Sequence, residues 1–518
     1  DNDVYSDFQK NGVTHLFAVS GMHVSFLVAT IIFLLNKLKI KEKYSNIIVI
    51  LFLIFYMFLI GFSASIVRTA LLYIFLLVNK RLKIGLKSVY VLYLVFILLL
   101  IINPFYIYDL GFLYSFLTSW GLILFSKKIK GGYITKLFKV SLIAFLFSLP
   151  ITISNFYKFN LLTIFNNMII VPFISLILFP FTLVVFIIPI LEPILIFLFN
   201  ILEYINYVLR LIKLEITVPK ISFVFLGIYY FIIYLYYKWG YKSLGLLGSL
   251  FIIIKARPYT DMNAYVYFLD VGQGDSSLII SPQRKEIIMI DTGGLISYPK
   301  EEWQERNNKF NLANNIISFL NSLGLDYLDL LIITHGDIDH LGYAKDIMCE
   351  IKVKKIMVNN NKINNYEKEL IQNKEIIKDS YLTKNIKINN LNFSVSDDEN
   401  ASSLVLYTKI NHNSFLFMGD APLEVEKEII NNYQLKSNFL HVGHHGSNTS
   451  SDYDFIKKVN PEYAIISSGR NNRYHHPSRE TLDTLDILNI DYFNTQNTGT
   501  IKVIVKKDGR KKLVFCPP

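Results

Sequence analysis

Recurring apolar stretches, separated by short polar clusters, fill this 518-residue chain from about Phe17 to Lys255. Hydrocarbon offers backbone amides no hydrogen-bond partners, so a chain of this kind crosses a bilayer as helices. The residues after Arg257 are polar throughout, yet the mean hydropathy of the whole chain is +0.37, which requires a very apolar first half. We therefore predict a polytopic α-helical membrane domain over residues 15–255, with about eight to ten helices.

The Lys and Arg residues of this region form clusters that follow alternate apolar stretches. Such clusters favour the cytoplasmic side of a membrane, so they explain much of the net charge of +11 without invoking nucleic acid. If successive apolar stretches cross the membrane in alternate directions, the cytoplasmic clusters place residues 1–14 outside the cell, as an extracytoplasmic tail. If the proline-interrupted run 161–202 holds two spans, the polar half of the chain also lies outside. The chain begins with Asp1 and has no signal peptide, so we expect a fragment that lacks N-terminal segments of a longer protein.

A few polar groups lie within or beside the apolar stretches, where ionisable groups are costly. Arg68 lies in the third stretch, and we expect it to face a pore or a partner. His15 and Asp109 either line an aqueous path or anchor helices at the membrane surface. The first stretch begins with a Ser-Gly pair between two histidines. The channel candidates are His15, Ser20, Gly21, His23, Arg68 and Asp109.

Residues 264–518, which follow a linker at 256–263, have the composition of a soluble α/β domain. Strand-like runs at 264–269, 286–290 and 328–333 each end in polar residues, and helical and strand patterns alternate to the end of the chain. The chemistry is therefore expected along one rim of a sheet. The chain has only two cysteines, which excludes a disulfide framework and a cysteine-based zinc site.

The densest group of metal-ligand candidates follows the third of these strands. His335, Asp337, Asp339 and His340 lie within six residues, and carboxylates and imidazoles on a tight turn suit zinc, manganese or iron. The alternative is an ordinary polar turn that happens to contain two histidines. Ligation is favoured because seven of the ten histidines belong either to this group or, with an isolated carboxylate, to clusters that follow later strands. The residues of the later clusters are Asp420, His441, His444, His445, His475 and His476.

Two unrelated sets of motifs, one in each half, resemble the ComEC family of competence membrane proteins. The soluble half is similar to metallo-β-lactamase-like hydrolases at 268–275, 291–293, 335–340, 419–420, 444–447 and 476–477. In the membrane half, residues 15–23 are similar to the family's HLLAISGLHV segment and residues 109–116 to its DPGFQLSF segment. The resemblance implies a competence-type membrane domain followed by an α/β metallo-β-lactamase-like αββα sandwich.

The resemblance further implies a protein of DNA uptake in natural transformation, located in the bacterial plasma membrane. The membrane domain would pass a single DNA strand inward, and the hydrolase domain would act as a nuclease outside, degrading the complementary strand. Its partners would be DNA, membrane lipid and other proteins of the uptake machinery.

The same resemblance implies the ligands of one or two divalent metal ions. One ion would be held by Asp339, His340 and His476, the other by His335 and Asp337, and Asp420 would be shared by both. The broader superfamily has a histidine where Asp337 stands. The superfamily also has a further histidine that is missing here. The corresponding region, residues 399–404, contains only Asn400 and Ser402 as candidates in its place. A site poorer in nitrogen favours manganese, or a weakly held second ion, over a tight zinc pair, and magnesium is a further candidate.

Other residues receive supporting or catalytic roles from the resemblance. Asp270, Asp275 and Asp291 would orient ligands or shape the rim. Asp339 would also accept a proton during phosphodiester hydrolysis. His445, in preference to His444, would contact the phosphate or protonate the leaving oxygen.

Two other functions fit the same sequence. One is a membrane-anchored hydrolase of another surface phosphodiester, because a fold does not fix a substrate. The other is a transporter with a catalytically degenerate metallo-β-lactamase-like module, which the missing histidine supports. Arg470, Arg473 and Arg479 either bind phosphate groups or are solvated loop charges. Salt-sensitive DNA binding and a metal count would separate these functions.

Overall fold

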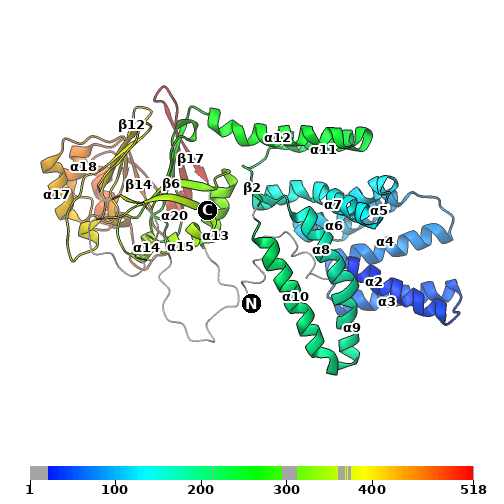
Figure 1. Ribbon diagram of the computed structural model, residues 1–518. Helices are drawn as coiled ribbons and strands as arrows, with labels where there is room; N and C mark the ends of the chain where they lie inside the picture. Colours follow the sequence, from blue (N-terminus) through cyan, green and yellow to red (C-terminus); the bar gives the residue numbers. More distant parts are fainter. Residues whose placement is uncertain are drawn as a thin grey trace. The chain divides into compact units, whose positions relative to one another are not determined.

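The structure is a computed structural model that describes residues 21–212, 214–294, 312–359 and 379–516, together with 368, 370 and 375–377. It divides into two compact units, residues 1–249 and 250–518 (Figure 1). His15 and Ser20, two of the channel candidates, lie outside the described residues.

The first unit is built from apolar helices. They are α2 (Gly21–Lys37), α3 (Glu42–Leu59), α4 (Ala64–Arg81), α5 (Ser88–Ile102), α6 (Leu110–Phe125), α7 (Tyr133–Phe156), α8 (Thr163–Pro172), α9 (Phe179–Ile187), α10 (Glu192–Arg210), α11 (Phe223–Trp239) and α12 (Leu244–Ala256), the last of which continues into the second unit. Large apolar side chains on the helix surfaces are widely exposed, for example Phe186 at 87% and Phe223 at 92%. A surface of this kind fits lipid rather than water.

Six helical runs among the described residues are long and apolar enough to cross a membrane. The proline-interrupted run supplies two of them, Thr163–Ile187 and Pro189–Arg210. Pro189 and Pro193 lie in the first turns of helical segments, where a missing backbone N–H costs little. Pro180 lies inside the run Thr163–Ile187, directly after the π-helical turn Phe173–Leu178. Two shorter apolar helices, Gly21–Lys37 and Ser88–Ile102, accompany the six. The chain is thus a membrane protein, while the expected eight to ten spanning helices stay a prediction.

The second unit contains two β-sheets. The larger has the order β17-β16-β3-β4-β5-β6-β7-β8, and the smaller has the order β15-β14-β13-β12-β11-β10-β9. The larger is formed by β3 (Ala264–Phe268), β4 (Ser277–Ile280), β5 (Ile287–Ile290), β6 (Tyr327–Ile332), β7 (Lys352–Met357), β8 (Glu375–Ile377), β16 (Thr500–Val505) and β17 (Lys511–Cys516). The smaller is formed by β9 (Tyr381–Leu382), β10 (Lys387–Asn390), β11 (Leu406–Ile410), β12 (Asn413–Phe417), β13 (Phe439–His441), β14 (Tyr463–Ile466) and β15 (Asp491–Asn494).

The two sheets pack face to face, with helices on both outer faces. Successive side chains of β3 point to opposite faces of the larger sheet. Val266 and Phe268 belong to the core between the two sheets. Tyr267 belongs to the core between the larger sheet and the helices α13 (Leu312–Ser322) and α15 (Ala344–Glu350). The smaller sheet is covered by α17 (Leu423–Asn432) and α18 (Tyr453–Val459), both labelled in Figure 1, and by α19 (Arg479–Ile487). The predicted αββα sandwich is confirmed.

The strands that precede the histidine and aspartate motifs are parallel to their neighbours. β6 pairs in parallel with β5 and β7, and β13 pairs in parallel with β12 and β14. The carboxyl ends of parallel strands meet at one edge of a sheet, so the loops after β5, β6, β12 and β13 are brought together. These loops carry Asp291, residues 335–340, Asp420 and residues 444–445.

Candidate metal centre

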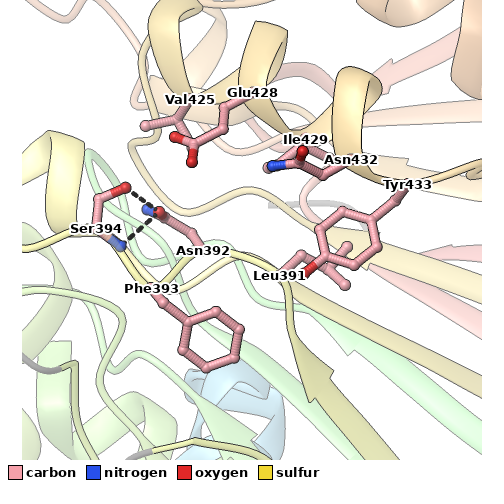
Figure 2. Close-up of a pocket in the computed structure, with 9 residues that line it drawn as sticks. All are labelled: Leu391, Asn392, Phe393, Ser394, Val425, Glu428, Ile429, Asn432 and Tyr433. Atoms are coloured by element: carbon pink, nitrogen blue, oxygen red, sulfur yellow. Dashed lines mark hydrogen bonds between the residues drawn. The ribbon is translucent and has the colours of Figure 1, made fainter.

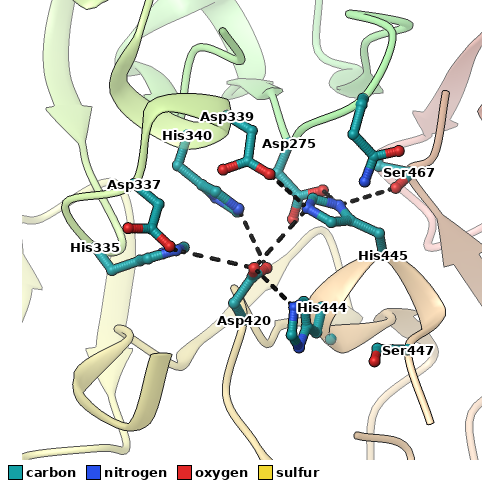
Figure 3. Close-up of polar contacts among 12 residues, drawn as sticks. Asp275, His335, Asp337, Asp339, His340, Asp420, His444, His445, Ser447 and Ser467 are labelled. Atoms are coloured by element: carbon teal, nitrogen blue, oxygen red, sulfur yellow. Dashed lines mark hydrogen bonds and ion pairs between the residues drawn. The ribbon is translucent and has the colours of Figure 1, made fainter. Parts of the chain in front are cut away.

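Asp420 lies at the centre of a buried group of histidines, as Figure 3 shows. Its Oδ1 is 3.2 Å from His340 Nε2. Its Oδ2 is 3.7 Å from His444 Nε2 and 3.9 Å from the Nε2 atoms of His335 and His445. One carboxylate therefore faces four imidazoles that come from two loops far apart in the sequence.

The donor atoms at this centre fit a divalent cation. His335 Nε2, His340 Nε2 and Asp420 Oδ1 are buried and make no hydrogen bond within the described residues. Four overlapping groups of three residues each have ligand atoms within 4.8 Å of one another, and together they contain Asp275, Asp291, His335, Asp339, His340, Asp420 and His445. Mixed imidazole and carboxylate donors are suited to zinc and manganese.

Asp291 and Thr334 hold the histidines of the first loop in place. Asp291 Oδ2 is 2.9 Å from His340 Nδ1, and the same carboxylate accepts hydrogen bonds from the backbone N–H and the hydroxyl of Thr334, both at 2.8 Å. The Thr334 hydroxyl also lies 3.1 Å from His335 Nδ1. These contacts direct the Nε2 atoms of both histidines toward Asp420.

Ser403 is a supporting residue that the sequence did not single out. Its hydroxyl lies 3.2 Å from His335 Nδ1 and accepts a hydrogen bond from the backbone N–H of Asp420 at 3.1 Å. Ser402, one of the two residues offered by the sequence in place of the missing histidine, bonds instead within its own loop, to Ser396. No local sequence signal identifies Ser403, because its contact with His335 joins residues that are 68 positions apart.

His444 and His445 lie on a sharp turn, η11 (Gly443–Gly446), and both have left-handed backbone conformations with φ of 48° and 55°. Non-glycine residues rarely adopt this region, and such strain is concentrated at functional sites. His445 Nδ1 lies 3.1 Å from both Asp275 Oδ1 and the Ser467 carbonyl, and its Nε2 lies 3.2 Å from Asp339 Oδ2. His445 is buried, whereas the His444 side chain is 26% exposed.

Gly274 allows the two aspartate motifs to approach each other. A Cβ at this position would lie 2.3 Å from the backbone oxygen of Asp339, and its φ is +130°. The next residue, Asp275, donates its backbone N–H to the same oxygen at 3.2 Å. Glycine is therefore required for Asp275 and Asp339 to share the centre.

The carboxylates of the centre favour protonated His340 and His445, and these two imidazoles in turn favour ionised Asp339. Burial lowers the pKa of His340 and His445, but Asp420 and the other nearby carboxylates outweigh it and raise both pKa values well above the ordinary one. Burial raises the pKa of Asp339, but the hydrogen bond with His445 and the charge of His340 bring it to about 2. A cation that binds here displaces these protons, so metal binding weakens as the pH falls.

Three residues expected at the centre lie at its margin or away from it. The Asp337 carboxylate is half-exposed, 3.6 Å from His335 Nε2. The His476 ring lies 5.8 Å from that of His444, and burial together with His445 and His444 lowers its pKa to about 4. Neither residue belongs to the four groups. The Asp270 carboxylate accepts the N–H of Gly272 in its own loop.

In the membrane unit, Asp109 caps α6 by accepting the N–H of Phe112 at 2.8 Å. The His23 ring lies 4.5 Å from that of Phe179. Gly21 and Arg68 lie near each other, because a Cβ on Gly21 would be 2.8 Å from Arg68 Nη2.

A cavity of about 210 Å³ lies elsewhere in the soluble unit, between residues 391–394 and α17 (Figure 2). Glu428 is the only carboxylate among its nine lining residues, and no histidine lines it. The Asn392 side-chain oxygen is occupied by the backbone N–H and the hydroxyl of Ser394. The metal-ligand candidates of the unit thus gather around Asp420 and not at this cavity.

We expect the substitution Asp275→Asn to weaken metal binding about ten- to a hundredfold, the range for loss of a group that orients a metal-ligating histidine. Asparagine keeps the shape of the side chain but removes the charge that faces His445 Nδ1 at 3.1 Å and His441 Nδ1 at 3.6 Å. Metal titration of the soluble unit measures this effect. Asp270→Asn in the same motif is the matched control and should bind metal like the wild type. Equal affinity in Asp275→Asn would show that Asp275 does not orient a ligand.

Residues 1–242 match the model of the Competence protein family, and residues 269–470 match that of the Metallo-beta-lactamase superfamily. Over 97% of its length the chain is 31% identical to ComE operon protein 3 of Bacillus subtilis (strain 168), of which it covers 69%. It is 27% identical to Competence protein ComA of Neisseria gonorrhoeae over 51% of this chain and 36% of that one. It is 28% identical to Recombination protein 2 of Haemophilus influenzae over 50% of this chain and 31% of that one.

Proposed function

Because the chain belongs to the ComEC family of competence proteins, we propose that it takes up DNA, with a membrane unit that passes one strand and a soluble unit that hydrolyses the other. The soluble unit acts as a metal-dependent phosphodiesterase on the outer side of the plasma membrane. The observation that carries this proposal is the convergence of four imidazoles on the buried carboxylate of Asp420.

The residues that would hold the cation are His335, His340, Asp339, Asp420 and His445, with Asp337 and His476 at the margin. When bound, a divalent cation activates water and neutralises charge on the phosphate. Asp339 accepts a proton in this proposal, because its carboxylate belongs to a candidate ligand group and is still 18% exposed.

His444 rather than His445 contacts the phosphate and protonates the leaving oxygen in this proposal. His445 has contacts on both ring nitrogens and is buried, so it has little freedom to meet a substrate. The His444 ring is more exposed, and its Nδ1 is fixed by the Thr449 hydroxyl at 2.9 Å, which leaves Nε2 directed toward Asp420. This reverses the order of preference that the family resemblance suggested.

A nucleic-acid substrate is supported by aromatic and basic groups beside His476. The Tyr474 ring stacks on His476 with centroids 5.8 Å apart, and the Arg473 guanidinium lies 4.9 Å from the Tyr474 ring. Both Tyr474 and Arg473 are exposed. Aromatic rings that can stack on bases, next to cations that can contact phosphates, are typical of proteins that bind single strands.

The test is incubation of residues 250–518 with labelled single- and double-stranded DNA in the presence of Mg²⁺, Mn²⁺ or Zn²⁺. We expect cleavage that requires a metal, is strongest with Mn²⁺ or Zn²⁺ and weakens with added salt. Binding of metal without cleavage of either DNA would indicate a degenerate module. Salt-insensitive hydrolysis of a small phosphodiester, with DNA left intact, would indicate a different surface substrate.

A further inference from the structure

Arg68 is a buried cation inside the membrane unit. It lies on α4, is 7% exposed, and its Nη1 donates to the Ser115 carbonyl of α6 at 2.9 Å and to the Ser119 hydroxyl. Its Nη2 donates to the Thr69 hydroxyl at 3.0 Å. The Nε atom is buried without a hydrogen bond from any described residue. The guanidinium is thus held in place but retains unused donor capacity.

Among the described residues no carboxylate compensates the charge of Arg68, and the guanidinium carbon lies 5.8 Å from the centroid of the Phe116 ring. All of its hydrogen-bond partners among the described residues are neutral oxygens, and no carboxylate pairs with it there. A buried cation without a carboxylate partner is costly, and in membrane proteins such residues mark paths for ions or polar substrates. If Arg68 only linked α4 to α6, a neutral side chain would make the same bonds at lower cost.

The groups around Arg68 have the chemistry of a phosphate site. The Ser65 and Ser115 hydroxyls lie 3.2 Å apart, and the hydroxyls of Thr69 and Ser119 accept from the guanidinium. The Thr69 hydroxyl donates to the Ser65 carbonyl at 2.9 Å and would have to turn from it to donate to a phosphate. Arginine together with hydroxyl donors is the usual set for a phosphate group. Gly21 brings the backbone of α2 against the same point, since a Cβ there would lie 2.6 Å from the Thr69 hydroxyl.

We propose that Arg68, with Ser65, Thr69, Ser115 and Ser119, binds a phosphodiester group of a single DNA strand where α2, α4 and α6 meet. This inference rests on the proposed DNA uptake and names a contact for the strand that passes through the membrane unit. The charge of Arg68 is then compensated by each phosphate in turn.

The full chain in a maltoside detergent, which has no phosphate, is titrated with a fluorescent single-stranded oligonucleotide over a range of salt. EDTA is present so that no metal-dependent cleavage shortens the probe. We expect R68Q to bind the oligonucleotide more weakly than the wild type. The slope of log K plotted against log salt concentration should also be shallower by about 0.7, the value for one phosphate contact on a single strand. R68K keeps the charge and should keep most of the slope. An oligonucleotide with a neutral methylphosphonate backbone should bind R68Q and wild type alike.

Arg81 is the matched control, because it ends the same helix and is exposed. R81Q should change the slope less than R68Q does. S119A removes a hydroxyl but keeps the charge, so it separates packing from charge and should keep the slope. The proposal would be overturned if R68Q kept the wild-type salt slope, or if R81Q lowered the slope as much as R68Q does. It would also be overturned if R68Q lowered the slope only after phosphatidylglycerol was added.

Failure of this inference is distinguishable from failure of the proposed function. Cleavage of DNA by the wild type when Mn²⁺ replaces EDTA tests the proposed function, whereas the salt slope of R68Q tests only the Arg68 site. If the wild type cleaves DNA and R68Q keeps the wild-type salt slope, only the Arg68 site is wrong. If the wild type neither binds nor cleaves DNA, the proposed function is wrong as well.

Discussion

Replacing His340 by alanine is expected to lower the rate of metal-dependent DNA cleavage by about three orders of magnitude, the upper range for removal of one group that stabilises transition-state charge. His340 belongs to three of the four candidate ligand groups, and its Nε2 lies 3.2 Å from Asp420 Oδ1. Its loss removes a ligand and also leaves Asp291 without its imidazole partner. The measurement is kcat/KM for a labelled duplex with residues 250–518.

His475 supplies the matched control for this substitution. It is exposed and belongs to none of the four ligand groups, although it lies in a motif with another histidine. His475→Ala should therefore cleave DNA within a fewfold of the wild-type rate. A folded His340→Ala variant, judged by its melting transition, that retained full activity would rule out the centre as the site of hydrolysis.

Replacing Asp420 by alanine in the metal-free soluble unit is expected to reduce the free energy of unfolding by about 3–5 kcal/mol, the cost of breaking a buried charge pair. Asp420 is 3% exposed and faces four imidazoles, and its loss removes the carboxylate that does most to raise the pKa values of His340 and His445. Denaturant unfolding with EDTA measures this loss. Asp483→Ala is the control: its carboxylate is exposed and 4.0 Å from Arg479, so less than about 1 kcal/mol is expected. A similar loss in both variants would show that Asp420 is not the electrostatic centre.

The effect of Asp420→Ala should depend on pH. Burial raises the pKa of Asp420, but the charges of His340, His445 and His335 outweigh it and hold the pKa well below its ordinary value. The carboxylate therefore contributes fully above the unfolded pKa of about 3.9, and this contribution is lost as the pH falls through the folded value. The raised pKa values of His340 and His445 act in the opposite direction, contributing fully below about 6.5 and less as the pH rises through their folded values. The largest difference between variant and wild type is thus expected between about pH 4 and 6.5.

The strands and the main ligand loop could be predicted from sequence because their signals are local. The apolar run at 328–333 is followed directly by the histidines and aspartates of 335–340, and the structure has β6 at Tyr327–Ile332. The isolated Asp420 was also expected at the centre. Its location follows from the parallel pairing of β12 with β13, which brings residues 420 and 444 to the same rim.

Other features depend on contacts between distant residues, which composition and spacing do not contain. Ser403 lies next to His335 across 68 positions of sequence, so nothing near either residue indicated the contact. His445 is buried whereas His444 is more exposed, and the buried position of His445 involves a contact with Asp275, which is 170 positions away in the sequence. The partners of Arg68 lie on α6, 47 and 51 positions away. Alternative roles for such residues therefore could not be resolved from sequence.

The most direct measurement is a crystal structure of residues 250–518 grown with Mn²⁺ and recorded at a wavelength where manganese scatters anomalously. We expect one or two anomalous peaks within coordination distance of Asp420, each also contacting Nε2 of His335, His340 or His445. Anomalous density located away from Asp420, or none at a manganese concentration that supports cleavage, would contradict the account.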